Sequence, residues 1–543
     1  MRLPTRLIDL GPSSEKTDHV RLIETWNLPA PLAAEPYRYI ALSYRWGEGN
    51  RLLTTKATYS QRQTAIEVQA IPKTIRDAVL VTRRLGIRYL WVDALCIIQD
   101  DEQDWKKEAA RMGDIYMNAL CTIAAHAADH ADCGFLQEAL ERELVVACGG
   151  KNSQAFLASK GTYARHHLDR TELSSRGWVM QERILSPRTI HFGKAGALYF
   201  ETRDKVEHIE VGKESGYRPF PGLRDALGVL DKLQGEQDEA PSLSTLQVNL
   251  VPFLTRNNIG EKVTVLMSPD ELVYNGWYEL VTRYSACLLT ENKDKLVALS
   301  GIVRKCQQVN KDRYVSGIWL HPDHFHVCLL WLGNGKEPLV TGTGAPSWSW
   351  ASILGKVQYI HGLGMLEREI SHIKSEVKLE AVHPGPGVDN QSDTIEGPAI
   401  LELSNVVMIN REKTGLRFVH FRAGVPWHYS LNKYLNLDKP ARIWDIHDDD
   451  GERIGWASLD TYPGVSDEFG KPGEFIRASD EGITCFKMAV HDNDRVHTGH
   501  NRGYVVMFVV FDEAAGVWKR VGLGQITKRE LFDGVEGTTV KLG

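Results

Sequence analysis

The stretch IPKTIRDAVLVTRRLGIRYLWVDALCIIQDDEQDWKKEAARMGDIYMNA, residues 71–119, decides the fold class. It opens with a helical pattern in which four side chains share one face: Ile75, Val79, Thr82 and Leu85. Gly86 follows at a C-cap position, so we predict that this helix ends there. The next run, IRYLWVDALCIIQ, is apolar almost throughout, which is typical of a central strand in a parallel sheet. Asp104 then predicts the N-cap of a second helix, which begins near residue 105.

Strand signals also lie on either side of this stretch. YRYIALSYRWGEGN contains an apolar run that stops at the Trp46–Gly47 turn, and LCTIAAHAA is another apolar run. SSRGWVMQERILSPRTIHF gives a short helix near 177–185, a turn at Pro187 and a further strand. Four strands are predicted, at 38–43, 88–97, 120–125 and 188–193. Strands that alternate with helices indicate an α/β domain with a mainly parallel sheet flanked by helices.

Composition divides the chain into four segments. Residues 1–36 are an N-terminal extension, and residues 37–200 form the α/β domain. Residues 201–262 are more polar, and we interpret them as a linker or an insertion. Residues 263–543 begin with helical patterns and continue with short strand-like runs between Gly and Pro clusters, which predicts a mixed helical and then β-rich C-terminal region.

The charge balance bears on the class of partner. Sixty-four Lys and Arg against 70 Asp and Glu give a formal charge of -6, which favours neither nucleic acid nor an anionic membrane. No apolar stretch of about 20 residues and no signal-peptide pattern occurs, so we expect no membrane span and a cytoplasmic protein. The chain has no G-x-x-x-x-G-K-[ST] string, which argues against a P-loop nucleotidase.

We predict no metal site, and the sequence identifies no certain cofactor. The eight cysteines include no C-x-x-C pair, which argues against a structural zinc site and a disulfide framework. The alternative to this prediction is metal binding by one of two histidine-rich strings, namely HPDHFH (His321, His324 and His326) and HDNDRVHTGH (His491, His497 and His500). Neither is completed by a known carboxylate–histidine pattern.

Three strings in order resemble the fungal heterokaryon-incompatibility (HET) domain proteins: YIALSYRWG, residues 71–119 followed by CTIAA, and SSRGWVMQERILSPRTIHF. Downstream, YSACLLTENKDKLVALSGI and APSWSWAS look like segments that follow the domain in this family. The resemblance implies a role in allorecognition, in which detection of a partner triggers growth arrest or cell death. Many relatives carry Cys between the Tyr and Trp of the first string, whereas this chain has Arg45, which excludes a thiol nucleophile there.

HET domains are distantly similar to Toll/interleukin-receptor (TIR) domains, and this similarity implies a TIR-like sheet. In TIR domains that cleave NAD, a helix after a strand supplies a glutamate within a Ser-x-Trp-Cys-x-x-Glu pattern. Trp105 and Glu108 keep the Trp-x-x-Glu spacing in the comparable place, while Lys106 replaces the Cys. The likeness therefore implies that NAD is a substrate and that Glu108 is catalytic.

Two carboxylates are the candidate catalytic groups. Cleavage of the N-glycosidic bond of NAD passes through a ribosyl cation, which a nearby carboxylate stabilises. Glu108 is the first candidate; the alternative is that it only accepts a hydrogen bond from a neighbouring strand or pairs with Arg111 or Lys107. Asp93 is the second, and its alternative is a buried ion pair with Arg176 or Arg183.

The remaining candidates are expected to contact the substrate, because loops converge at the carboxyl ends of parallel strands. They are Ser43, Tyr44, Arg45, Trp46, Gly47, Trp105, Arg176, Trp178, Gln181, Glu182 and Arg183. For the tryptophans the alternative is core packing. A Cys96–His126 nucleophile is disfavoured, because Cys96 lies in an apolar run and buried thiols are normally inert.

Three functions remain open at this level. The first is a cell-death or incompatibility effector whose TIR-like domain cleaves NAD or a related nucleotide. The second is a non-enzymatic module that self-associates or binds an incompatibility partner protein. The third is a family member recruited to convert a small metabolite.

Overall fold

The computed structural model describes 21 segments of the chain, and every structural statement below refers to them. They are residues 3–12, 17–29, 37–48, 52–137, 144–147, 156–159, 168–209, 213–214, 219–235, 251–256, 262–322, 325–333, 344–359, 373–385, 394–395, 398–409, 416–420, 443–460, 475–477, 482–491 and 503–543. The chain forms two compact units. Unit 1 comprises Met1–Gly276 and Val297–Val309, and unit 2 comprises Trp277–Leu296 and Asn310–Gly543.

A mixed sheet organises unit 1, in the strand order β12-β11-β10-β9-β6-β3-β5-β1-β2-β4. The central strands β9 (Arg188–Phe192), β6 (Cys121–Ala124), β3 (Tyr39–Ser43) and β5 (Tyr89–Trp91) are parallel. The outer strands pair antiparallel, and they are β1 (Arg6–Asp9), β2 (His19–Glu24), β4 (Ile66–Glu67), β10 (Leu198–Thr202), β11 (Val206–His208) and β12 (Lys213–Glu214).

The prediction of a mainly parallel sheet is therefore correct only for the centre of the sheet. Two additions make the whole sheet mixed. Residues 1–36, treated above as an extension, supply β1 and β2, and β1 pairs antiparallel with β5. After β9 the chain continues through tight connections into β10 and β11, and consecutive strands joined in this way are necessarily antiparallel.

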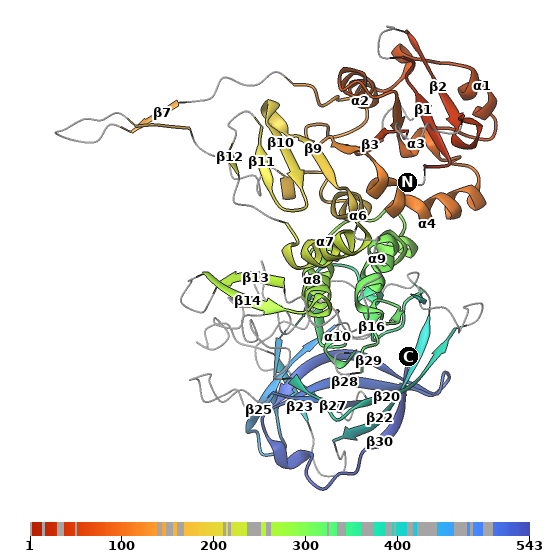
Figure 1. The fold of residues 1–543 in the computed structure, drawn as a ribbon. Helices are drawn as coiled ribbons and strands as arrows, with labels where there is room; N and C mark the ends of the chain where they lie inside the picture. Colours follow the sequence, from red (N-terminus) through yellow and green to blue (C-terminus); the bar gives the residue numbers. More distant parts are fainter. Residues whose placement is uncertain are drawn as a thin grey trace, which may run out of the picture. The chain divides into compact units, whose positions relative to one another are not determined.

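Helices cover both faces of the parallel centre (Figure 1). α2 (Lys73–Arg84) lies on one face, and α4 (Glu102–Asn118) and α6 (Gly177–Leu185) lie on the other. The β3-to-β5 connection runs across the sheet in one direction, and the β5-to-β6 and β6-to-β9 connections run in the opposite direction. Because connections between parallel strands are right-handed, the two directions place their helices on opposite faces of the sheet. The predicted helix ends near Gly86 and at 177–185 agree with α2 and α6 to within two residues.

Two local predictions around β5 are wrong. The strand expected over 88–97 ends at Trp91, and Asp93–Cys96 form the short helix α3. The Asp93 carboxylate accepts a hydrogen bond from the Ala94 amide over 2.7 Å, which stabilises a turn where the apolar run suggested a strand. The N-cap of α4 is Asp101 rather than Asp104, because the Asp101 side chain accepts from the amides of the second and third helical residues.

The strand order has a consequence for binding. Numbered along the chain, the parallel strands β3, β5, β6 and β9 are arranged second, first, third and fourth, so the order reverses between β3 and β6. In open α/β sheets, ligands bind outside the carboxyl ends of the strands at such a switch point. The loops after β3 and β6 are therefore where a binding site is expected.

The segment predicted as a linker, residues 201–262, contains regular structure. Besides β11 and β12 it includes α7 (Pro221–Gly235) and β13 (Val251–Arg256), which pairs with β14 (Lys262–Met267). Leu223, Ala226 and Leu227 of α7 are buried, at the spacing of one helical face. Unit 1 also contains α1 (Tyr59–Thr64) and the hairpin of β7 (Leu144–Ala147) and β8 (Phe156–Ser159). All of α9 (Ser300–Asn310) except its last residue belongs to unit 1 as well.

Unit 2 is β-rich, as predicted. Five of its strands pair in a closed ring, β22-β27-β28-β29-β30-β22, which makes a five-stranded barrel. These strands are β22 (Ala399–Met408), β27 (Ile483–His491), β28 (Tyr504–Asp512), β29 (Val517–Ile526) and β30 (Thr538–Leu542). Unit 2 also contains the part of α8 (Pro269–Tyr284) from Trp277 onward and the short helix α10 (Phe325–Cys328). Its other strands are β15 (Tyr314–Val315), β16 (Ile318–Trp319), β17 (Trp331–Gly333), β18 (Val357–Tyr359), β19 (Ile373–Lys374), β20 (Lys378–Pro384), β21 (Thr394–Ile395), β23 (Arg417–His420), β24 (Ile443–His447), β25 (Arg453–Leu459) and β26 (Phe475–Arg477).

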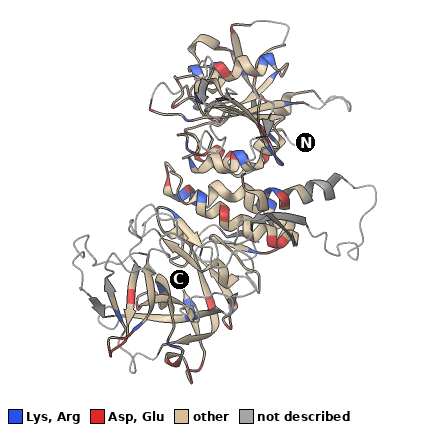
Figure 2. Ribbon diagram, turned by 90° about the vertical axis from the view of Figure 1, so that its left-hand side faces the viewer, with Lys and Arg blue, Asp and Glu red and all other residues tan. Residues whose placement is uncertain are grey.

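Charged residues of both signs are interspersed along the described helices and strands (Figure 2). This distribution agrees with the small formal charge of the whole sequence. Among the described residues, no helix combines the length and apolarity that crossing a membrane requires.

Candidate functional site

Five side chains from four elements form a polar cluster at the carboxyl ends of β3 and β5. We call it the carboxylate cluster, and its members are Ser43, Asp93, Tyr116, Arg176 and Glu182. Ser43 ends β3, Asp93 begins α3, Tyr116 lies on α4, Arg176 directly precedes α6, and Glu182 lies within α6. Ser43 places the cluster at the end of β3, one of the two strands that flank the switch point.

The turn after β3 sets one side of the cluster. All five residues of β3 are buried, so the strand delivers Ser43 and Tyr44 to the interior, whereas Trp46 is partly exposed. Gly47 has φ +71°, and a Cβ at this position would lie 2.4 Å from the Cβ of His130. Only glycine accepts both the backbone conformation and this close approach, so Gly47 shapes the turn.

Asp93 is held by two hydrogen bonds. The Trp46 Nε1–H donates to Asp93 Oδ2 over 2.9 Å, and the Ala94 amide donates to Oδ1. Burial raises the pKa of the Asp93 carboxyl, and the positive charge of Arg176 opposes this rise. The residue as a whole is partly exposed, whereas its carboxyl group is buried, so this is a perturbed carboxyl close to the surface.

Glu182 is the most unusual carboxyl of the cluster. The residue is only 5% exposed, and within the described part of the chain its Oε2 has no hydrogen-bond partner; the same holds for the Ser43 hydroxyl. Burial raises the pKa of Glu182 to about 7, although Arg176 and the nearby hydroxyls of Ser43 and Tyr116 favour ionisation. At neutral pH this group therefore both accepts and donates a proton, as a general acid–base residue must.

Arg176 supplies the positive charge of the cluster. As the residue before α6 it adopts an extended backbone, and its guanidinium donates to the backbone carbonyl of Tyr44. It is partly exposed, and its charge acts on both Asp93 and Glu182. Arg45, 43% exposed, forms an ion pair with Glu172 over 3.4 Å and donates to the carbonyl of Asp129. Arg45 and Arg176 are thus two partly exposed cations that flank the turn after β3 in the sequence or bind it, and such groups bind anionic ligands.

Glu108 lies outside the carboxylate cluster. It is fully buried, it accepts a hydrogen bond from the Thr5 hydroxyl, and its Oε1 is 3.8 Å from Arg111 Nη1. Thr5 directly precedes β1, which pairs with β5 on the side opposite β3. Of the contacts named above in the alternative for Glu108, the structure contains the one with Arg111, and the hydrogen bond that it accepts comes from Thr5, the residue before β1.

Four other residues predicted to contact the substrate are not members of the carboxylate cluster and make contacts of their own. Trp105 and Trp178 are partly exposed and pack edge to face, with ring centroids 6.5 Å apart. Gln181 is fully buried and accepts a hydrogen bond from the Gly301 amide. Arg183 binds Glu201 and Asp169, so the ion pair with Asp93 that the sequence suggested is not formed by this arginine.

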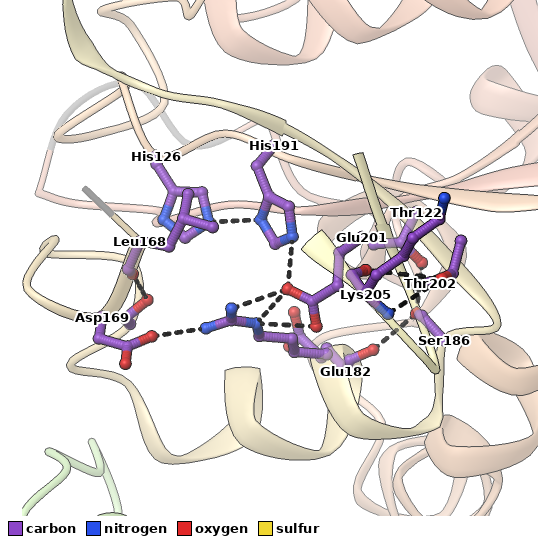
Figure 3. Close-up of polar contacts among 12 residues, drawn as sticks. Thr122, His126, Leu168, Asp169, Glu182, Ser186, His191, Glu201, Thr202 and Lys205 are labelled. Atoms are coloured by element: carbon purple, nitrogen blue, oxygen red, sulfur yellow. Dashed lines mark hydrogen bonds and ion pairs between the residues drawn. The ribbon is translucent and has the colours of Figure 1, made fainter. Parts of the chain in front are cut away.

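Figure 3 shows a buried network, not predicted from the sequence, that includes His126, His191 and Glu201. His126 Nε2 lies 2.9 Å from His191 Nδ1, and His191 Nε2 lies 3.0 Å from Glu201 Oε2. Arg183 and Arg224 bind the same Glu201 carboxylate. A sequence signal existed, because in the β9–β10 hairpin Tyr199 faces His191, and Glu201, two residues on, shares that sheet face.

The structure gives no support to a metal site or a cysteine nucleophile. No group of three or more His, Cys, Asp or Glu in the described residues has metal-binding geometry. His324, His497 and His500 lie outside those residues. Burial raises the pKa of Cys96 to about 12, and His126 is bonded to Thr171 and His191, so the disfavoured Cys96–His126 pair is absent.

Comparison with known proteins identifies part of unit 1. The family model described as "Heterokaryon incompatibility protein (HET)" matches residues 39–182, and these residues form a HET domain. The chain is 32% identical over 123 residues to "Heterokaryon incompatibility protein 6, OR allele" of Neurospora crassa, a distant homologue. That alignment covers 21% of this chain and 17% of the relative. No solved structure matches. The predicted resemblance is thus confirmed for this domain.

Proposed function

We propose that this chain is a cytoplasmic incompatibility effector whose HET domain cleaves the N-glycosidic bond of NAD or a related nucleotide at the carboxylate cluster. The observation that carries the proposal is Glu182: a buried carboxyl with a pKa of about 7 and an unpaired oxygen, beside the switch point of the sheet. Strongly perturbed carboxyls beside a second titrating group are typical of catalytic sites. The proposal includes two further points: the HET domain has a TIR-like fold, and the chain binds an incompatibility partner protein.

The arrangement suits the proposed chemistry. The bond between ribose C1′ and the nicotinamide nitrogen breaks with its electron pair moving to nitrogen, so the leaving group needs no proton. The Asp93 carboxylate stabilises the resulting ribosyl cation. Water adds to C1′ and gives its proton to the ionised form of Glu182. Arg45 and Arg176 bind the pyrophosphate, and Trp46 or Trp178 stacks on a ring of the substrate.

The direct test is to incubate the purified full-length protein with NAD at pH 7 and to follow nicotinamide release by chromatography. The heat-unfolded protein is the control for background hydrolysis. We expect release that saturates with NAD concentration. Absence of release from folded protein would contradict the proposal. Two measurements would then decide between the other functions. A melting-shift screen with small metabolites tests the metabolite-converting enzyme, and a measurement of self-association tests the non-enzymatic module.

A further inference from the structure

A hydroxyl, two imidazoles and a carboxylate form one continuous hydrogen-bonded row in unit 1. Thr171 Oγ1 lies 2.8 Å from His126 Nδ1, which continues through His191 to Glu201 over 2.9 and 3.0 Å. His126, His191 and Glu201 are at most 2% exposed, whereas Thr171 is partly exposed. The row therefore begins at the surface and ends on a buried negative charge.

The ionisation of Glu201 fixes the direction of every hydrogen bond. Arg183 and Arg224, more than offsetting burial, hold the pKa of Glu201 well below its usual range, so the carboxylate only accepts. His191 Nε2 must then carry the proton, which leaves Nδ1 of neutral His191 as an acceptor for His126 Nε2–H. His126 Nδ1 is in turn an acceptor, and it faces the hydroxyl proton of Thr171.

The proton of Thr171 has competing acceptors, but His126 is the nearest. The Ser174 hydroxyl is 3.3 Å away and the Leu168 carbonyl 3.4 Å away, compared with 2.8 Å for His126 Nδ1. Ser174 donates its own proton to Leu168. A hydroxyl bonded to a base, with that base oriented by further groups, is the arrangement of an activated nucleophile.

We propose that Thr171 is the nucleophile of a second active site, which hydrolyses acyl esters, with His126 as its general base. Thr171 Oγ1 attacks the ester carbonyl carbon as its proton passes to His126 Nδ1. The ester C–O bond breaks, and the leaving alcohol takes that proton. Water then adds to the acyl-threonine through the same base and releases the acid. His191 and Glu201 are positioning residues that keep His126 in the required tautomer. This activity is independent of NAD cleavage.

A fluorophosphonate probe tests the proposal on the full-length protein, because it reacts with activated hydroxyls. The threonine O–P bond forms, fluoride leaves, and the proton goes to His126. Intact mass and peptide mapping should find one phosphonyl group on Thr171 in the wild type. Thr171→Ser should retain labelling, and Thr171→Ala should lose it. Ser174→Ala is the matched control, a partly exposed hydroxyl in the same loop that donates to a carbonyl, and it should be labelled at the wild-type rate.

The base is tested by His126→Gln, which should slow labelling by about 10²- to 10⁴-fold. If that variant does not fold, the Thr171 substitutions alone decide, since this side chain is partly exposed. Labelling of folded wild-type protein at another residue, or no labelling at all, would overturn the proposal. So would equal labelling of Thr171→Ala and the wild type.

Discussion

The indole of Trp46, just after β3, donates a hydrogen bond to the Asp93 carboxylate at the start of α3, over 2.9 Å. The two residues are 47 positions apart and meet because β3 and β5 are parallel neighbours. The contact joins the loop after β3 to a carboxylate with a perturbed pKa, which is the part of the site where we expect the ribosyl cation.

Trp46→Phe tests this contact. An aromatic ring remains, but Asp93 loses a donor, and we expect about 1 kcal/mol of lost stability together with a further rise of the Asp93 pKa. Ionisation of Asp93, followed by NMR of its carboxyl carbon, should move to higher pH. An unchanged titration of Asp93 would show that Trp46 does not hold its carboxylate.

Glu182→Gln should stabilise the domain above neutral pH. A carboxyl with a pKa of about 7 when folded, against an ordinary value of 4.5, lowers stability as the pH rises from about 4.5 to about 7, because only the unfolded chain then ionises freely. The loss reaches about 3 kcal/mol above pH 7, and it is absent below pH 4. Melting curves of the two proteins should therefore coincide in acid and separate with increasing pH.

The opposite pH dependence is expected from the two buried histidines. Burial, together with neighbouring positive charge, lowers the pKa of His126 well below 6.5, and burial also lowers that of His191. The unfolded chain then binds more protons below pH 6.5, so stability falls as the pH decreases from about 6.5. His126→Gln should flatten the melting temperature between pH 7 and pH 5. An equally steep acid loss in this variant would assign the effect to other groups.

A close approach of two glycines gives a packing test. Gly113 on α4 and Gly301 on α9 are so close that a Cβ on Gly301 would lie 2.8 Å from the Gly113 Cα. Gly301→Ala should therefore cost about 1–3 kcal/mol in chemical denaturation. Gly228→Ala on α7 is the matched control, because nothing lies within 4 Å of its added Cβ, and it should stabilise by about 0.5–1 kcal/mol.

The sequence predicts the parallel centre of unit 1 well, because buried central strands are nearly continuous apolar runs. Local patterns carry less information about what joins that centre. β1 and β2 enter the sheet through pairing with β5, a long-range choice that no short pattern encodes. The run Ala94–Cys96 is equally compatible with strand and helix, and the Asp93 carboxylate bound to the Ala94 amide settles the turn.

The candidate site depends on the same difference between local and long-range information. Ser43, Trp46 and Asp93 lie at or just after the ends of β3 and β5, so the strand pattern alone is enough to predict that they lie near one another. Spacing alone suggested Glu108, but its environment depends on β1, which the pattern did not place. His191 and Glu201 required the register of the β9–β10 hairpin.

Glu108→Ala should destabilise the protein, because it removes a carboxylate that binds both Thr5 and Arg111. Losing a hydrogen bond to a buried charged group costs about 2 kcal/mol. Glu108→Gln keeps an acceptor for Thr5 and should cost less. Urea unfolding of both variants measures this order. A fully stable alanine variant would contradict the structural role of Glu108.

NAD cleavage by Glu182→Gln and Glu108→Gln, compared at pH 7 on protein shown to be folded, tests the central claim most directly. Glu182→Gln should release nicotinamide on the order of 10²-fold more slowly than the wild type or worse, while melting at a higher temperature. Glu108→Gln should retain a rate within a few-fold of the wild type. The reverse result, an active Glu182→Gln and a folded but inactive Glu108→Gln, would contradict the assignment of the chemistry to the carboxylate cluster.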